Sequence, residues 1–316
     1  MSELSKFLFE GLPVRGVIVR LTDSWKQVLA ARAKSGPWPP AVQQMLGEMA
    51  AAATLMQANL KFDGALVLQV HGDGPVKLAV AEALSDLRFR VTAKVQGEVA
   101  PDAPFDQLVN RHGEGRCAIT LDPQGRQPGQ QPYQGVVPLE APDGGPVGGV
   151  AAMLEHYMRQ SEQLETRIVL ASNDEAACGL LIQRLPIEGA GNLAGAGQAE
   201  IDADAFNRIS HLASTLTATE LLTLDTPTIL HRLFWEEPLR LFEPLRPTFS
   251  CSCSAERVRN MLRNLGREEA ESILAERPDI EIGCDFCGAQ YHFDAVDVGE
   301  MFAPVTSQPG AGSQLH

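Results

Sequence analysis

Hydrophobic residues recur along the chain with two periods, and each period predicts one kind of element. After Pro40 they return every three or four positions as far as Leu60, which indicates one long amphipathic helix. The same spacing predicts a second helix from Val150 to Leu164. Short apolar runs bounded by Gly, Pro and Asp predict strands at Val14–Leu21, Ala65–His71, Val76–Ala81, Phe89–Val95, Cys117–Leu121, Gln134–Leu139, Thr166–Ala171 and Gly179–Leu185.

These strands follow one another in meander-like order, with helices before and after them. We therefore expect an α+β fold with an N-terminal α+β core domain over residues 1–190. Gly72-Asp-Gly-Pro75 joins two of the strands as a hairpin turn. It does not match a phosphate-binding loop, because it lacks the Lys-Ser/Thr ending and no helix follows it. Ser24 is expected to cap a short helix that begins at Trp25.

Beyond the core, a Gly/Ala-rich stretch at residues 189–200 predicts a hinge, and residues 191–249 are expected to form a metastable helical linker. Thr217 and Glu220 have the spacing of a capping box, and Thr226-Pro227 starts a further helix. Helices this short are marginal alone in water, so their apolar faces must dock on a neighbour. The segment is either a docked linker, which the sequence alone favours, or one that undocks and exposes those faces.

Four of the six cysteines give the strongest chemical signal, in a C-terminal domain expected over residues 250–303. Cys251 and Cys253 form C-x-C, and Cys284 and Cys287 form C-x-x-C after a thirty-residue gap. Each pair offers two thiolates from one tight turn, as tetrahedral zinc requires. We therefore expect one closed four-thiolate site for a single Zn²⁺. His292 could replace a thiolate, but four cysteines already fill the tetrahedron.

The domain around these cysteines looks too small to fold unaided. Ser254 is expected to cap a helix that ends at Gly266, a second helix follows, and two short strands flank the second cysteine pair. About fifty residues with few large apolar side chains bury little surface. Structural zinc contributes about 10–16 kcal/mol, so loss of the metal should unfold the domain. Gly283 and Gly288 beside the second pair should supply backbone freedom, and residues 304–316 should form a flexible tail.

Structural disulfides or unpaired core cysteines are the other interpretation. The N-terminus shows no apolar export signal, so a cytoplasmic location is expected, where structural disulfides are rare. A disulfide across C-x-C would close a small strained ring that is easily reduced, which suggests a site that changes state. Cys117 and Cys178 lie in or beside predicted strands and are expected to be small core residues.

Charge and motifs limit the classes of function. The net charge is -14 and the pI about 4.9, whereas nucleic-acid-binding proteins usually carry a basic face, and an anionic membrane surface is disfavoured for the same reason. No Ser/His/Asp order or nucleophile elbow is present, so no catalytic residues are assigned and an enzyme is not expected. Two alternatives stay open: a zinc-ribbon nucleic-acid-binding protein, and an enzyme whose N-terminal domain holds a polar pocket with perturbed titratable groups.

A resemblance to a known family extends over nearly the whole chain, to about Phe302. It is carried by Gly72–Pro75 with Lys77–Glu82, Pro132–Leu139, Glu155–Leu164, Gly179–Pro186, Leu230–Glu237 and the C-x-C…C-x-x-C frame. In this combination the sequence is similar to the heat-shock protein 33 family (33-kDa chaperonin), which are redox-regulated holdase chaperones. One departure is Cys178, where such sequences tend to have glycine; it adds a thiol outside the frame.

The resemblance implies a stress-response chaperone that is inactive when reduced and zinc-bound. Oxidation would form the disulfides Cys251–Cys253 and Cys284–Cys287 and release zinc. The linker would then unfold, and apolar surface would bind unfolding client proteins without ATP. The resemblance further implies that the activated protein is a homodimer.

Overall fold

The computed structural model describes residues 1–125, 131–141, 144–186 and 196–303, and only the backbone of residues 196–203. Contacts divide the chain into two compact units, Met1–Cys251 and Ser252–His316. Residues 189–195 of the expected hinge, and the expected tail 304–316, lie outside the described residues. The remaining hinge positions, 196–200, are already helical, because α5 spans Ala196–Ser214.

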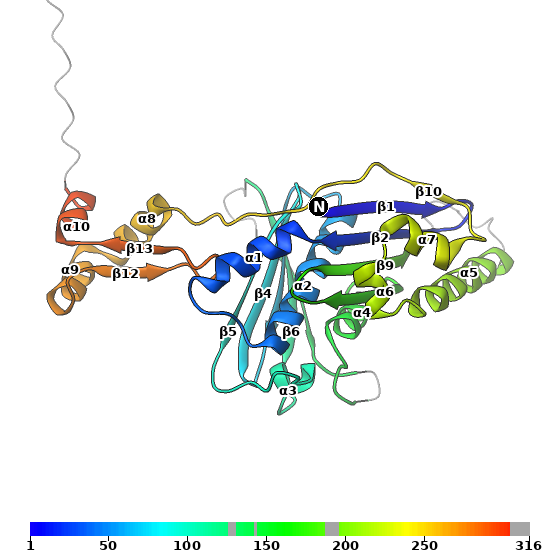
Figure 1. Ribbon diagram of the computed structural model, residues 1–316, viewed down its shortest axis with the longest axis horizontal. Coiled ribbons are helices and arrows are strands. Elements are labelled where there is room, and N and C mark those ends of the chain that lie inside the picture. The colour runs from blue at the N-terminus through cyan, green and yellow to red at the C-terminus, as the bar shows by residue number, and fades with distance from the viewer. Residues whose placement is uncertain (126–130, 142–143, 187–195, 304–316) are drawn as a thin grey trace, which may run out of the picture. The chain divides into compact units, whose positions relative to one another are not determined.

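Two sheets form the framework of the first unit (Figure 1). The five-stranded sheet has the order β10-β1-β2-β9-β8, which are Leu239–Leu241, Glu3–Phe9, Val14–Leu21, Ala177–Arg184 and Thr166–Ser172. The six-stranded sheet has the order β11-β5-β4-β3-β6-β7, which are Thr248–Phe249, Arg88–Val95, Val76–Leu84, Gly64–His71, Arg116–Pro123 and Tyr133–Pro138. Neighbouring strands are antiparallel except β11, which runs parallel to β5. The expected α+β fold is confirmed, and eight of these strands match the predicted runs closely.

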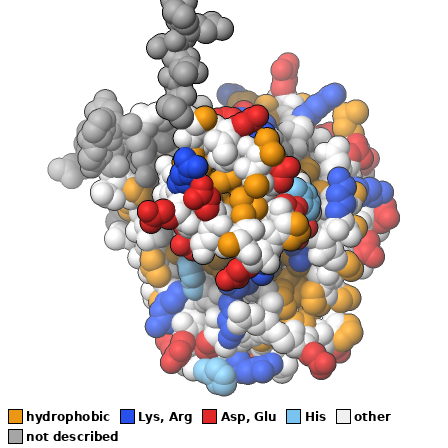
Figure 2. Space-filling model, turned by 90° about the vertical axis from the view of Figure 1, so that its left-hand side faces the viewer, with side chains coloured by type: hydrophobic (Ala, Val, Ile, Leu, Met, Phe, Trp, Pro, Cys, Tyr) orange, Lys and Arg blue, Asp and Glu red, His pale blue; other side chains and the backbone are white. Residues whose placement is uncertain are grey.

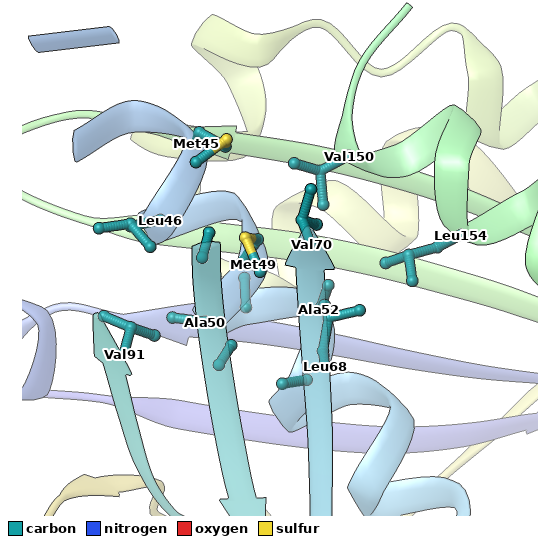
Figure 3. Close-up of a cluster of buried hydrophobic side chains, with 14 of the residues drawn as sticks. Met45, Leu46, Met49, Ala50, Ala52, Leu68, Val70, Val91, Val150 and Leu154 are labelled. Atoms are coloured by element: carbon teal, nitrogen blue, oxygen red, sulfur yellow. The ribbon is translucent and has the colours of Figure 1, made fainter. Parts of the chain in front are cut away.

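Helix α2 (Pro40–Asn59) packs against both sheets and forms the centre of the larger core. Fifteen of its 20 residues are buried, so it is enclosed on nearly every side rather than merely amphipathic. Figure 3 shows Met45, Leu46 and Met49 of this helix among side chains of β3, β5 and α4 (Val150–Gln160). The small side chains of residues 50–53 let the strands approach the helix closely.

The five-stranded sheet is buried on both faces. Along β2, Val17 and Val19 point into the core around α2, whereas Val14 and Ile18 point into a second cluster. That second cluster contains the apolar faces of α5, α6 (Ala218–Thr223) and α7 (Thr226–Phe234). The three helices lie along this sheet in Figure 1. The segment expected as a helical linker is therefore docked in this structure, on an apolar sheet face of its own unit.

Several elements differ from expectation. Helix α1 spans Asp23–Ala33, so the predicted start at Trp25 is wrong by two residues. Ser24 lies inside the helix, buried, with its hydroxyl 2.7 Å from that of Ser2, and does not cap the helix. Strands β1, β10 and β11 and helices α3 (Phe105–Val109) and α10 (Ala295–Met301) were not predicted.

The second unit has a thin core of its own. It contains α8 (Ala255–Leu265), α9 (Arg267–Glu276), the hairpin β12 (Ile280–Gly283) and β13 (Gln290–Phe293), and α10. Ser254 accepts a hydrogen bond from the Arg257 amide, and Gly266 ends α8 with φ 103°, as expected. The buried cluster contains only Leu262, Ala270, Ile280, Phe293, Val298 and Met301. None of the helices in the described part of either unit is long and apolar enough to cross a membrane.

Candidate metal centre

Four cysteine side chains meet at one point. The Sγ atoms of Cys251, Cys253, Cys284 and Cys287 all lie within 4.8 Å of one another. Those of Cys253 and Cys287 are 3.3 Å apart. Four thiolates bound to zinc at about 2.3 Å would be about 3.8 Å from one another. The four cysteines therefore lie close enough to hold one metal ion, and an all-thiolate donor set is typical of a closed structural zinc site.

A tight turn presents the second cysteine pair. The Gly288 amide donates to the Cys284 carbonyl at 2.8 Å, and the Cys284 amide donates to the Ala289 carbonyl at 2.8 Å. Gly288 has φ 69°, which favours glycine, as the sequence indicates. Gly283 differs from expectation, because it pairs with Gln290 as part of β12 and its φ is not positive.

One tyrosine contacts the cluster directly. The hydroxyl of Tyr291, on β13, donates to Cys253 Sγ at 3.1 Å. This hydrogen bond, together with partial burial and the negative charge of the neighbouring thiolates, raises the pKa of Tyr291 to about 12. The phenol therefore stays protonated at neutral pH and serves as a fixed donor to sulfur, which is the role of a residue that orients a metal ligand.

The first cysteine is anchored from the six-stranded sheet. Strand β11 pairs Phe249 with Phe89 of β5, and the Ser250 amide donates to the Phe89 carbonyl at 3.0 Å. This pairing places Cys251 beside Arg90, whose guanidinium is hydrogen-bonded both to Glu82 (2.6 Å) and to the Cys251 side chain. Burial by itself lowers the pKa of Arg90. The hydrogen bonds and negative charges of Glu82 and Cys251 together outweigh this effect, so the pKa is raised overall. A permanent positive charge thus lies against one sulfur of the cluster.

The other candidate residues lie elsewhere. Cys117 and Cys178 are fully buried in the first unit, in agreement with the expected role as small core residues. Burial raises the pKa of Cys117 to about 12 and that of Cys178 to about 11, so both thiols are unreactive as long as they stay covered. His292 is not part of the cluster, and its Nδ1 lies 2.7 Å from Asp279.

The structure also bears on the enzyme and nucleic-acid alternatives. A hollow of about 340 Å³ beside α2 is lined in part by Glu48, and burial raises the pKa of this carboxyl to about 7. The residues that line this hollow include a second carboxyl group, Asp102, but no Ser, Cys, His or Lys. On the face in Figure 2, acidic and basic side chains are interspersed rather than gathered by sign. The hollow is thus the kind of polar pocket with a perturbed titratable group that the enzyme alternative requires, whereas the mixed charges on this face do not favour the binding of a phosphate backbone.

Fold and site together define an α+β protein in which four cysteines, three of them in the small C-terminal unit, lie close enough to hold one metal ion. The chain belongs to the Hsp33 protein family, whose profile matches residues 2–294. It is 47% identical over 300 residues to the 33 kDa chaperonin of Chromobacterium violaceum, covering 95% of this chain and 93% of that protein. It is 44% identical over 301 residues to the 33 kDa chaperonin of Neisseria meningitidis serogroup B, covering 94% and 90%.

A solved structure has the same fold. The 33 kDa chaperonin (heat shock protein 33 homolog) of Thermotoga maritima aligns with a TM-score of 0.74 over 95% of this chain and 97% of that one. The two sequences are 21% identical, so this comparison supports the fold alone.

Proposed function

We propose that this protein is a redox-controlled, ATP-independent holdase: a chaperone that binds unfolding proteins under oxidative stress and is inactive while reduced and zinc-bound. Family membership supports a chaperone role. The observation that carries the control mechanism is the coexistence of two features. One is the four-cysteine cluster, three of whose members lie in a unit with a thin core, and the other is an apolar sheet face covered by helices α5, α6 and α7.

Zinc is the ion that the donor set fits best. Cys251, Cys253, Cys284 and Cys287 would hold it, and Tyr291 and Arg90 would orient and neutralise two of the thiolates. Bound zinc would supply cross-linking and thiolate charge neutralisation rather than catalysis. In the described part of the second unit, residues 252–303, the buried cluster has six apolar residues, so little else stabilises this unit.

Oxidation removes the ligands of the metal. Formation of each disulfide transfers two electrons from a pair of thiolates to one molecule of hydrogen peroxide, which takes up two protons and becomes two water molecules. The proposed pairs are Cys251–Cys253 and Cys284–Cys287, as the resemblance implies. The sulfur positions alone do not select these pairs, since all four lie within 4.8 Å. Thiolates consumed in disulfides no longer bind zinc, and the second unit loses its main source of stability.

The segment from α7 to Cys251 would transmit the loss of metal from the cysteines to the linker helices. It is held by three short attachments: three-residue β10 on β1, the Leu245–Leu4 bridge, and two-residue β11 on β5. Pairings this short contribute little by themselves. When Cys251 no longer binds metal, these attachments should open, and α7 and α6, with nine and six residues, should follow because helices this short are unstable undocked. Helix α5, which packs against α7, should then loosen from the sheet as well.

Undocking would expose two kinds of apolar surface for client proteins. One is the sheet face formed by Phe7, Phe9, Ile18, Leu180 and Ile182. The other is the helix faces that now cover it. We further propose a cytoplasmic location, a homodimer in the activated state, and no role in binding nucleic acid or membrane.

Light scattering from a heat-denaturing client tests the proposal. Peroxide-treated protein should suppress aggregation at near-stoichiometric amounts without ATP, and reduced zinc-loaded protein should not. Zinc release and free thiols should be measured in the same samples. Equal suppression by the reduced and oxidised forms, or full retention of zinc after oxidation, would refute the redox control.

A further inference from the structure

A single arginine holds the end of helix α6 against the sheet. Arg20 lies near the end of β2, on the sheet face that the linker helices cover. One of its terminal nitrogens, Nη1, donates to the Leu221 carbonyl at 2.9 Å and to the Leu224 carbonyl at 2.7 Å. The other, Nη2, donates to the Leu222 carbonyl at 3.1 Å. Three carbonyls at one helix end therefore converge on one guanidinium, 201 to 204 positions earlier in the sequence.

Helix α6 depends on contacts at both ends because it has only six residues. Its N-terminus is closed from within by the capping box of Thr217 and Glu220. Its last carbonyls have no amide partner further along the helix, and a positive charge is favourable at this end. Arg20 supplies both the donors and the charge, and it belongs to the sheet rather than to the linker.

A buried thiol lies next to this contact. Arg20 of β2 is the register partner of Cys178 on β9, and Cys178 belongs to the same buried cluster as Leu221 of α6. The thiol is fully covered while the linker helices are docked. Cys117, the other buried thiol, lies on β6 in the separate core around α2. The two thiols thus report on two different parts of the first unit.

We propose that Arg20 is a positioning residue that keeps α6 docked, and that loss of its three carbonyl contacts releases α6 and uncovers Cys178 while the core around α2 stays closed. This inference deepens the proposed function, because it names a contact that would restrain the linker in the reduced state. Docking of α6 in this way requires both terminal nitrogens of the planar guanidinium and not only its positive charge. An ammonium group carries its three donors on a single nitrogen, so it does not reproduce the contacts that Nη1 and Nη2 make from two positions.

Alkylation of the full-length, reduced, zinc-loaded protein with iodoacetamide tests the proposal. The extents of modification at Cys178 and Cys117 are followed separately by peptide mass spectrometry. The variants are Arg20→Met, which removes fork and charge, and Arg20→Lys, which keeps the charge. Arg88→Met is the control, since Arg88 is a strand arginine in an exposed ion pair with Asp86 and also loses one charge.

We expect Arg20→Met to raise the alkylation rate at Cys178 about 10- to 100-fold, because the rate follows the population of the open state and charged hydrogen bonds are lost. Arg20→Lys should fall between Arg20→Met and the wild type. Cys117 should stay unmodified in both variants, and Arg88→Met should resemble the wild type. Equal acceleration at Cys178 and Cys117 would mean general destabilisation, and it would overturn the proposal. So would an unchanged Cys178 rate in Arg20→Met, or a wild-type rate in Arg20→Lys.

The proposed chaperone function is judged by a separate measurement on the same samples. Reduced Arg20→Met should suppress client aggregation in proportion to the open fraction. Selective exposure of Cys178 without any suppression would leave the role of Arg20 intact and contradict the proposed function instead.

Discussion

Replacing Phe234 tests whether docking of the linker helices is what keeps the apolar sheet face covered. Phe234 is the last residue of α7 and is 2% exposed. Its ring lies 5.0 Å from that of Phe9 in an edge-to-face arrangement and 6.2 Å from that of Phe7. A buried Phe→Ala change costs about 3–5 kcal/mol, which includes the lost apolar contacts and the cavity. Within that total, the favourable geometry of each aromatic pair that is lost accounts for about 0.5–1.5 kcal/mol.

This cost falls on helix docking rather than on the whole fold, because Phe234 packs only in the cluster beneath α5–α7. Since 1.4 kcal/mol is a tenfold change in an equilibrium constant, Phe234→Ala should raise the undocked population by roughly two to three and a half orders of magnitude. Trp235→Ala is the matched control. Trp235 is the next residue, has an even larger aromatic side chain, and is 69% exposed, so its removal should change stability by only about 0.5 kcal/mol or less.

Amide hydrogen exchange on the reduced, zinc-loaded protein measures the effect directly. Amides of α6 and α7 should exchange much faster in Phe234→Ala than in Trp235→Ala, whereas those of α2 should remain protected. Client aggregation assays on the reduced variants should then show partial activity for Phe234→Ala alone. Wild-type exchange in Phe234→Ala, or the same acceleration in both variants, would refute the reasoning.

Three further predictions concern the metal, its neighbours and pH. Arg90→Met should weaken zinc affinity about 10- to 100-fold in a competition with a chelator. Arg88→Met, a change on the same strand at an arginine paired with Asp86, should leave the affinity unchanged. Equal zinc affinities of Arg90→Met and the wild type would exclude a role for the Arg90 guanidinium. Stripping the metal under reducing conditions should abolish exchange protection in α8–α10 and leave α2 protected, and persistent protection of α8–α10 would show that the second unit folds without metal. Burial raises the pKa of Glu48 from 4.5 to about 7, so the folded state binds this proton more tightly than the unfolded state, and stability should fall as pH rises between these values. The loss, on the order of 3 kcal/mol in total by urea titration, should disappear in Glu48→Gln, and a variant with the same pH slope as the wild type would contradict the assignment.

The sequence predicts well wherever the signal is local. The long helix around Met49, the strands with strong alternation and the capping box at Thr217 all depend on residues near one another, and the structure has them. The four cysteines could be assigned to one metal site from their spacing alone, because two close pairs of thiolates are a typical ligand set for a tetrahedral metal ion. Their convergence within 4.8 Å agrees with that grouping.

What the sequence did not reveal depends on distant partners. Strand β1 was missed because Ser5 and Lys6 interrupt its apolar run, and it is a strand because β2 and β10 pair with it. Strands β10 and β11 have three and two residues, so they exist only through pairing with strands far away in the chain. The contacts of Arg20 and Arg90 could not be predicted from the sequence either, because the position of an arginine on a strand does not indicate which distant carbonyl group or sulfur atom it will contact.

The double-sided burial of the five-stranded sheet has a consequence for recovery after stress. Alternate residues of β2 and β9 belong to two separate clusters, so uncovering one side leaves the packing of the other side in place. In the proposed mechanism, such a scaffold would release a bound client protein and return to the resting state without refolding from the beginning. Once the cysteines were reduced and a metal ion had bound again, α5, α6 and α7 would only have to dock again on a sheet face that had stayed folded.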